Sequence, residues 1–129
     1  FELGFIQSLL GVYYLRFGWF NGSNGSFRGP QSPFPLVAGK KYHILGTVER
    51  IDGVAHARLY INGVQVDYNT DEALPPIDSG KLLYIGAINY FESWGLAFKV
   101  SDVALYDHPI SAERVEMHAR ASGLFVEPE

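Results

Sequence analysis

Residues 55–67 read Ala-His-Ala-Arg-Leu-Tyr-Ile-Asn-Gly-Val-Gln-Val-Asp, and this stretch decides the fold. Asn62-Gly63 adopts positive φ angles at low cost, so a two-residue type I′ loop joins strands over 55–61 and 64–67. The loop predicts four opposed pairs: Ile61 with Val64, Tyr60 with Gln65, Leu59 with Val66, and Arg58 with Asp67. This register puts the apolar residues on one face and an Arg58–Asp67 ion pair on the other, so turn chemistry and hydropathy agree.

The flanking sequence predicts further strands. Alternation of apolar and polar residues indicates strands over 1–8, 11–20, 42–50, 81–87 and 96–106. Between them, the three prolines of residues 30–35 cannot supply ladder donors, so we expect an edge or extended connection there.

The C-terminal part predicts one short helix. Ser111 is a favourable N-cap residue, and Glu113 lies in the first turn, where the helix dipole favours an anion. Val115 and Ala119 are expected to face a sheet, and Gly123 provides the stop. A helix of about three turns is too short to stand alone, so it must dock on the strands.

Composition fits this reading. The 129 residues are 47% hydrophobic and 15% aromatic, with 14 Gly and 7 Pro spread along the chain. We therefore predict an all-β protein: an antiparallel two-sheet jelly-roll sandwich with a short C-terminal helix. Residues 1–129 are expected to form a single domain. Because the chain begins at Phe1, without Met and already in strand-like sequence, we expect it to be a fragment of a longer chain.

Charge and apolar runs argue against two classes of partner. The net charge is −4 and no basic cluster exceeds Lys40-Lys41, so no nucleic acid partner is expected. No apolar run approaches the roughly 20 residues that span a bilayer, so no membrane insertion is expected. The chain has no cysteine, which excludes disulfides and thiolate metal sites.

Three ordered blocks carry a family resemblance. They are 39–48 (GKKYHILGTV), 57–64 (ARLYINGV), and 83–87 (LYIGA) followed by 101–113 (SDVALYDHPISAE). From Gly39 onward the chain resembles the laminin G-like jelly roll domain of the concanavalin A-like lectin/glucanase superfamily. The resemblance implies a β-sandwich whose last strand leads into a short helix.

Catalysis is not expected. Glycan hydrolysis in the superfamily uses clustered acidic residues on one strand, and no expected strand here carries acidic residues at i and i+2. Glu113 and Glu116 are paired on the helix, where we expect a solvated face. Four scattered histidines, His43, His56, His108 and His118, show no spacing suited to a metal. We predict that the protein is not an enzyme.

An aromatic loop is the candidate ligand-binding site. Aromatic faces stack on the C–H faces of sugar rings, while amide and carboxylate groups read the hydroxyls. The loop supplies both kinds of group in Asn89, Tyr90, Phe91, Glu92 and Trp94. The alternative is that these aromatics pack within the molecule as lids over the core.

The resemblance also implies a possible calcium site, because several members of the superfamily bind Ca²⁺ through loop oxygens. Asp67, Asn69, Asp71 and Asp78 are hard oxygen donors near one sandwich edge. Their spacing matches no calcium-loop signature, so an acidic solvated loop is the favoured alternative. No cofactor is expected to be required.

Two functions remain open from the sequence. The first is a non-catalytic carbohydrate-binding or adhesion module of an extracellular or surface protein, with a glycan or protein partner. The second is a structural or decoration module of a larger assembly, such as a bacteriophage virion. Either places the chain outside the cell, on the cell surface or on a virion surface.

Overall fold

A computed structural model describes residues 2–7, 11–20, 26–72 and 99–128 of the chain. The chain divides into two compact units. The first comprises Phe1–Pro75 and His108–Glu129, and the second is Pro76–Asp107. The two sheets, the helix and the pockets belong to the first unit. The expectation of a single domain stays a prediction.

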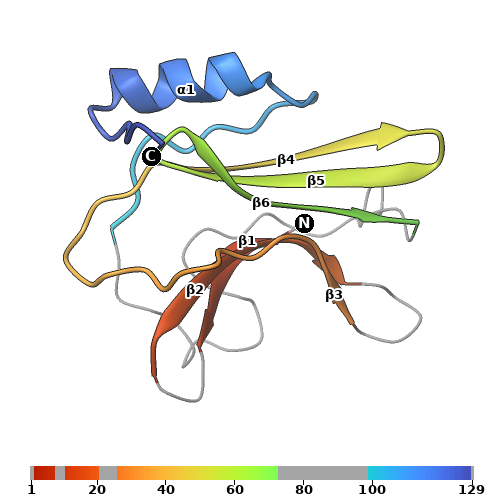
Figure 1. The fold of residues 1–129 in the computed structure, drawn as a ribbon, viewed down its shortest axis with the longest axis horizontal. Helices are drawn as coiled ribbons and strands as arrows, with labels where there is room; N and C mark the ends of the chain where they lie inside the picture. Colours follow the sequence, from red (N-terminus) through yellow and green to blue (C-terminus); the bar gives the residue numbers. More distant parts are fainter. Residues whose placement is uncertain (1, 8–10, 21–25, 73–98, 129) are drawn as a thin grey trace. The chain divides into compact units, whose positions relative to one another are not determined.

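The first unit contains two antiparallel three-stranded sheets and one helix. One sheet has the order β1-β2-β3, formed by Glu2–Gln7, Tyr13–Phe20 and Phe27–Arg28. The other has the order β4-β5-β6, formed by Ile44–Ile51, Val54–Ile61 and Val64–Asp71. Helix α1 (Ala112–Ala121) lies over one face of the second sheet, and the first sheet lies on the opposite side (Figure 1). The predicted all-β sandwich with a C-terminal helix is confirmed.

The core between the sheets joins β2 to β5. Leu15 and Phe17 of β2 pack in one buried cluster with Leu59 and Ile61 of β5. The ring of Phe17 lies where a side chain at Gly46 of β4 would be, since a Cβ there would be 2.4 Å from its Cγ atom. Only a glycine at this position lets the aromatic ring lie against the backbone of the facing sheet.

The proline-containing segment continues the first sheet, as the sequence predicted. Isolated bridges join Tyr13 to Leu36 and Arg16 to Gln31, both antiparallel to β2. Between them, the Ser32 hydroxyl accepts a hydrogen bond from the Leu15 amide at 3.0 Å. The segment is therefore an extended connection along β2, in which a side chain replaces part of the backbone ladder.

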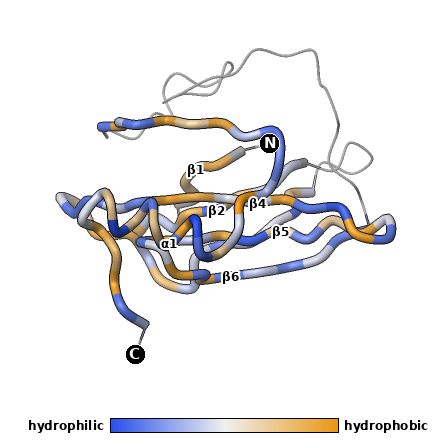
Figure 2. The backbone as a smooth tube through the Cα atoms, turned by 90° about the horizontal axis from the view of Figure 1, so that it is seen from above, coloured by the Kyte–Doolittle hydropathy of each residue, from blue (hydrophilic) through white to orange (hydrophobic). Residues whose placement is uncertain are grey.

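The hairpin is confirmed, but its predicted register is wrong beyond two pairs. Tyr60 opposes Gln65 as expected, whereas Leu59 opposes Asp67 because a β-bulge interrupts the ladder. The bulge places the extra residue Val66 toward the core and leaves Asp67 on the same inner side. The polar second half of β6, pale to blue in Figure 2, thus follows a register displaced by one residue.

The predicted Arg58–Asp67 ion pair is consequently absent. Arg58 opposes Tyr68, and its guanidinium lies 4.9 Å from the centre of that ring. The hydroxyl of Tyr68 is in turn 2.6 Å from Nδ1 of His56 on the same outer face. Asp67 instead accepts a hydrogen bond from the Gln31 amide at 2.8 Å.

The strand predicted over 96–106 is not present in its described part, residues 99–106. Asp102 has a φ angle of +57°, in the left-handed region that interrupts extended backbone. Val103 and Leu105, which the alternation assigned to one buried face, are 52% and 75% exposed. The strand predicted over 81–87 lies outside the described residues.

The turn geometry generates a stability prediction. Gly63 (φ +83°) and Gly53 (φ +78°) both lie in two-residue loops with positive φ angles. A Cβ at Gly63 would approach the side chains of Phe125 and Ala119 to 2.7 and 2.8 Å, whereas nothing lies within 4 Å of one at Gly53. Gly53→Ala should cost about 1–2 kcal/mol of unfolding free energy from backbone strain. Gly63→Ala should cost about 1–3 kcal/mol more because of overpacking.

Denaturant unfolding of both variants measures the difference. Equal losses would show that the hairpin tip does not support the helix and the tail that follows it.

Candidate functional site

The hairpin tip connects three parts of the chain. The Asn62 side chain accepts a hydrogen bond from the His43 amide at 2.9 Å, and the Asn62 amide donates to the His43 carbonyl at 2.7 Å. On the other side, the Val126 amide donates to the Asn62 carbonyl at 3.2 Å. The loop residues thus hold the start of β4 and the C-terminal tail at the same end of the sheet.

Helix α1 docks above this tip as the sequence predicted. Ser111 caps its N-terminus, where the hydroxyl accepts from the Arg114 amide at 3.3 Å. Val115 and Ala119 are fully buried. At the other end Gly123, with a φ of +74°, closes a Schellman motif in which the Leu124 amide donates to the Ala119 carbonyl at 3.0 Å. This motif turns the tail back toward the hairpin.

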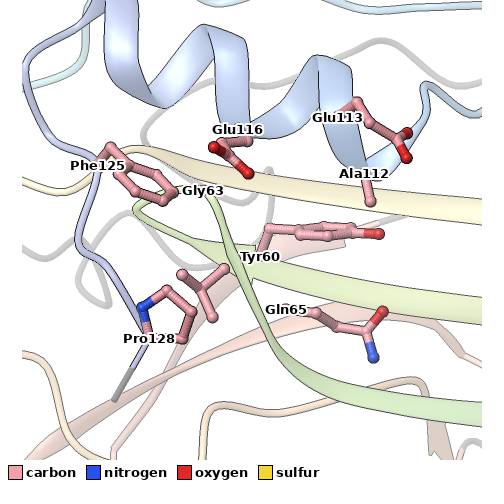
Figure 3. A pocket seen from close by; sticks show the side chains of 9 residues that line it. Tyr60, Gly63, Gln65, Ala112, Glu113, Glu116, Phe125 and Pro128 are labelled. Atoms are coloured by element: carbon pink, nitrogen blue, oxygen red, sulfur yellow. The ribbon is translucent and has the colours of Figure 1, made fainter.

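An open pocket of about 290 Å³ lies between the helix, the hairpin and the tail. It combines residues of β5 and β6 with residues of the helix and the tail, as Figure 3 shows. The lining residues are Tyr60, Gly63, Val64, Gln65, Ala112, Glu113, Glu116, Phe125 and Pro128. Its volume is close to the lower end of small-ligand sites, about 300 Å³, so it suits one small ring and no large ligand.

The carboxylates of the pocket differ in their partners. Glu116 accepts from Nε of Arg120 at 2.8 Å, and Nη2 of the same guanidinium donates to Glu127 at 3.0 Å. The guanidinium also lies 3.8 Å from the centre of the Phe125 ring. Glu113, by contrast, makes no ion pair with any residue in the part of the chain that the structure describes.

Tyr60 forms part of the pocket wall and is only 4% exposed. Burial raises the pKa of its phenol, with a smaller opposing effect from Arg58 and a smaller reinforcing effect from Glu113. The phenol thus stays protonated near neutral pH. Its hydroxyl has no hydrogen-bond partner among the described residues.

A second hollow of about 330 Å³ lies on the other side of the tail and is mainly apolar. Phe34, Val37 and Val126 line it and are 41%, 60% and 58% exposed. Exposed apolar side chains that gather at one place are typical of contact surfaces.

The amino-acid sequence matches a known protein family. A model for laminin G-type domains, described as the concanavalin A-like lectin/glucanases superfamily, matches residues 2–116. The chain belongs to this superfamily. Among curated proteins, no match is found.

A solved structure is similar in fold to this superfamily member. It is the crystal structure of residues 221–444 of an S-layer domain-containing protein from Clostridium thermocellum ATCC 27405. The TM-score is 0.52 at 22% sequence identity, and the match covers 84% of this chain. The chain spans 52% of that structure, so about half of it has no counterpart here.

The ligand-binding residues predicted from the sequence belong to the aromatic loop at 89–94. Asn89, Tyr90, Phe91, Glu92 and Trp94 lie outside the described residues, and their role stays a prediction. The pocket itself was missed because Glu113 and Glu116 were read only as a solvated helix face. One feature of the sequence could have indicated the pocket. The predicted hairpin register put the aromatic side chain of Tyr60 on the face opposite the apolar residues.

The residues predicted for calcium share the inner side of β6 beyond the bulge. Asp67 accepts from the Gln31 amide, and Asp71 forms an ion pair of 3.4 Å with Arg28. Oδ1 of Asn69 is buried without a hydrogen-bond partner. Because the Arg28 guanidinium would repel a cation, this arrangement does not fit calcium unless Arg28 moves.

No group of three metal-binding side chains occurs among the described residues. Asp78, the fourth predicted donor, lies outside them. The calcium site stays a prediction. No described helix is long and apolar enough to cross a membrane.

Two histidines meet where the helix approaches β4. The rings of His43 and His118 lie edge to face with centroids 6.5 Å apart, and Nδ1 of His43 is buried without a partner. Burial lowers the pKa of His43 below 6.5, and the charge of His118 lowers it further. The neutral ring is therefore the form that the fold favours.

This shift predicts a loss of stability in acid. Because the folded-state pKa lies below the unfolded value of 6.5, the unfolded chain takes up the proton first as pH falls. His43 thus contributes stability above about pH 6.5 that is lost below it. The loss should be smaller in His43→Gln than in the wild type, and intermediate in His118→Gln, which keeps the burial but removes the neighbouring charge.

Denaturant unfolding at about pH 7.5 and about pH 5.5 measures the loss for all three proteins. The interpretation is wrong if His43→Gln loses as much stability between these conditions as the wild type does.

Proposed function

We propose that the chain is a non-catalytic carbohydrate-binding or adhesion module of an extracellular or surface protein. The observation that carries the proposal is the pocket between α1 and the hairpin. Its lining includes the ring of Phe125, the amide of Gln65 and the side chain of Tyr60, around a volume suited to one sugar unit. Sugar binding needs this combination of an apolar wall with donors and acceptors.

Membership of a lectin-like superfamily supports the proposal, although fold alone does not fix function. The structural match comes from an S-layer domain-containing protein, and the surface location proposed here agrees with that setting. The aromatic loop at 89–94 is proposed as a further contact for a longer glycan.

The geometry of the pocket carboxylates supports binding over hydrolysis. A glycosidase needs one carboxyl group held protonated by its surroundings and a second one positioned as base or nucleophile. Glu116 forms an ion pair with Arg120 at 2.8 Å. Glu113 is exposed on the helix surface. Neither carboxylate has the apolar surroundings of a general acid.

Glycan arrays followed by titration of the full chain test the proposal. Gln65→Ala should weaken sugar binding about two- to ten-fold by removing one hydrogen-bonding amide. Trp94→Ala should weaken binding of longer glycans. Gln31→Ala is the control, because Gln31 is also exposed but does not line the pocket. Absence of binding to any glycan, or binding that neither test substitution alters, contradicts the proposal.

The alternative proposal is a structural module of a larger assembly. The exposed side chains of Phe34, Val37 and Val126 around the second hollow favour it. In that case the chain should associate with increasing concentration, and Val37→Asp should abolish the association.

Ile51→Asp is the control for this experiment, because Ile51 is 42% exposed and does not line either pocket. Sedimentation velocity measures the association. A monomer at every concentration would count against self-assembly through this surface.

A further inference from the structure

We propose that the pocket between α1 and the hairpin prefers sugars that carry a protonated amino group, such as glucosamine. The inference rests on the proposed function and specifies the ligand class of the same site. Two independent observations lead to it: the charge of the lining and the unpartnered hydroxyl of the largely buried Tyr60 side chain.

The first observation is an excess of negative charge. The residues that line the pocket include two carboxylates, Glu113 and Glu116, and no cationic side chain. The adjacent Arg120 is shared between Glu116 and Glu127, so one guanidinium balances two carboxylates. Glu113 remains without a cationic partner in the described part of the chain, and a ligand ammonium group would supply one.

The second observation is the unpartnered hydroxyl of Tyr60. Its side chain is almost completely buried, and its hydroxyl end is directed toward Ala112 and Glu113 at the pocket wall (Figure 3). The hydroxyl makes no hydrogen bond to a described residue, so it is available to a ligand that offers a donor or acceptor. Because the phenol is neutral, it can donate to a sugar oxygen or accept from a sugar hydroxyl.

The two features specify complementary parts of one ligand. An ammonium group at Glu113 and a ring hydroxyl at Tyr60 require both groups on the same small ring. Phe125 adds apolar surface to the pocket lining, and the exposed amide of Gln65 is available to a further hydroxyl. Arg58 acts on Tyr60 electrostatically but does not line the pocket, so it does not occupy the proposed ammonium position.

NMR titration of the full chain with glucosamine, glucose and N-acetylglucosamine tests the inference. At about pH 6 the amine of glucosamine is protonated, as expected for an amine with a pKa near that of an α-amino group. Glucosamine should bind about three- to ten-fold more tightly than the two neutral sugars, with shifts at the amides of the pocket.

Substitutions separate the two observations. Glu113→Gln should remove the preference for glucosamine while keeping binding to the neutral sugars. Glu49→Gln is the matched control, because it makes the same change in net charge at an exposed residue of β4 outside the pocket. Tyr60→Phe should weaken all three sugars without lowering stability, since the hydroxyl has no partner to lose.

The outcomes distinguish this inference from the proposed function. Equal affinities for glucosamine and glucose, or a preference that Glu113→Gln leaves intact, overturn the inference while the proposed function stands. Equally tight binding of Nα-acetyl-lysine amide overturns it in favour of a protein side chain as the ligand. Glycan binding that depends on Trp94 and leaves the pocket amides unshifted also overturns it. If no sugar binds anywhere, the proposed function itself fails.

Discussion

The packing around the Asn62-Gly63 turn is the constraint on which the pocket end of the molecule depends. Positive φ angles at both residues close the hairpin, and the backbone groups of Asn62 hold β4 on one side and the tail on the other. The missing side chain at Gly63 lets Phe125 and Ala119 approach the turn. One dipeptide thus sets strand pairing, helix docking and the path of the tail, and the pocket is the space left between them.

The sequence was sufficient to predict those elements whose geometry is set by neighbouring residues. The turn, the cap at Ser111 and the stop at Gly123 were predicted because their backbone angles and hydrogen bonds involve residues within a few positions of one another. The register of β6 could not be predicted in this way. Its bulge brings Asp67 to Gln31, a residue 36 positions away. The register of β6 therefore depends on tertiary contacts that the hydropathy pattern of the hairpin does not contain.

The same limit applies to the candidate site. The face of Tyr60 was predicted correctly, but its burial depends on a helix that begins about fifty residues later. Glu113 was assigned to the first turn, where the helix dipole stabilises its negative charge. No neighbouring residue in the sequence indicated that it also lines a pocket. The strand predicted over 96–106 shows the opposite error, because a clean alternation at Val103 and Leu105 did not outweigh the left-handed backbone at Asp102.

The pocket also contains two polar groups to which the described residues offer no partner. The hydroxyl of Tyr60 is one of them, because a phenylalanine would fill the same buried space and the hydroxyl bonds to no described residue. Glu113 is the other, because Glu116 and Glu127 share the guanidinium of Arg120 and Glu113 forms no ion pair with a described residue. The proposed ligand would offer a partner to both groups, an ammonium group to Glu113 and a hydroxyl to Tyr60, which is why the pocket and not the sheet surface is proposed as the site.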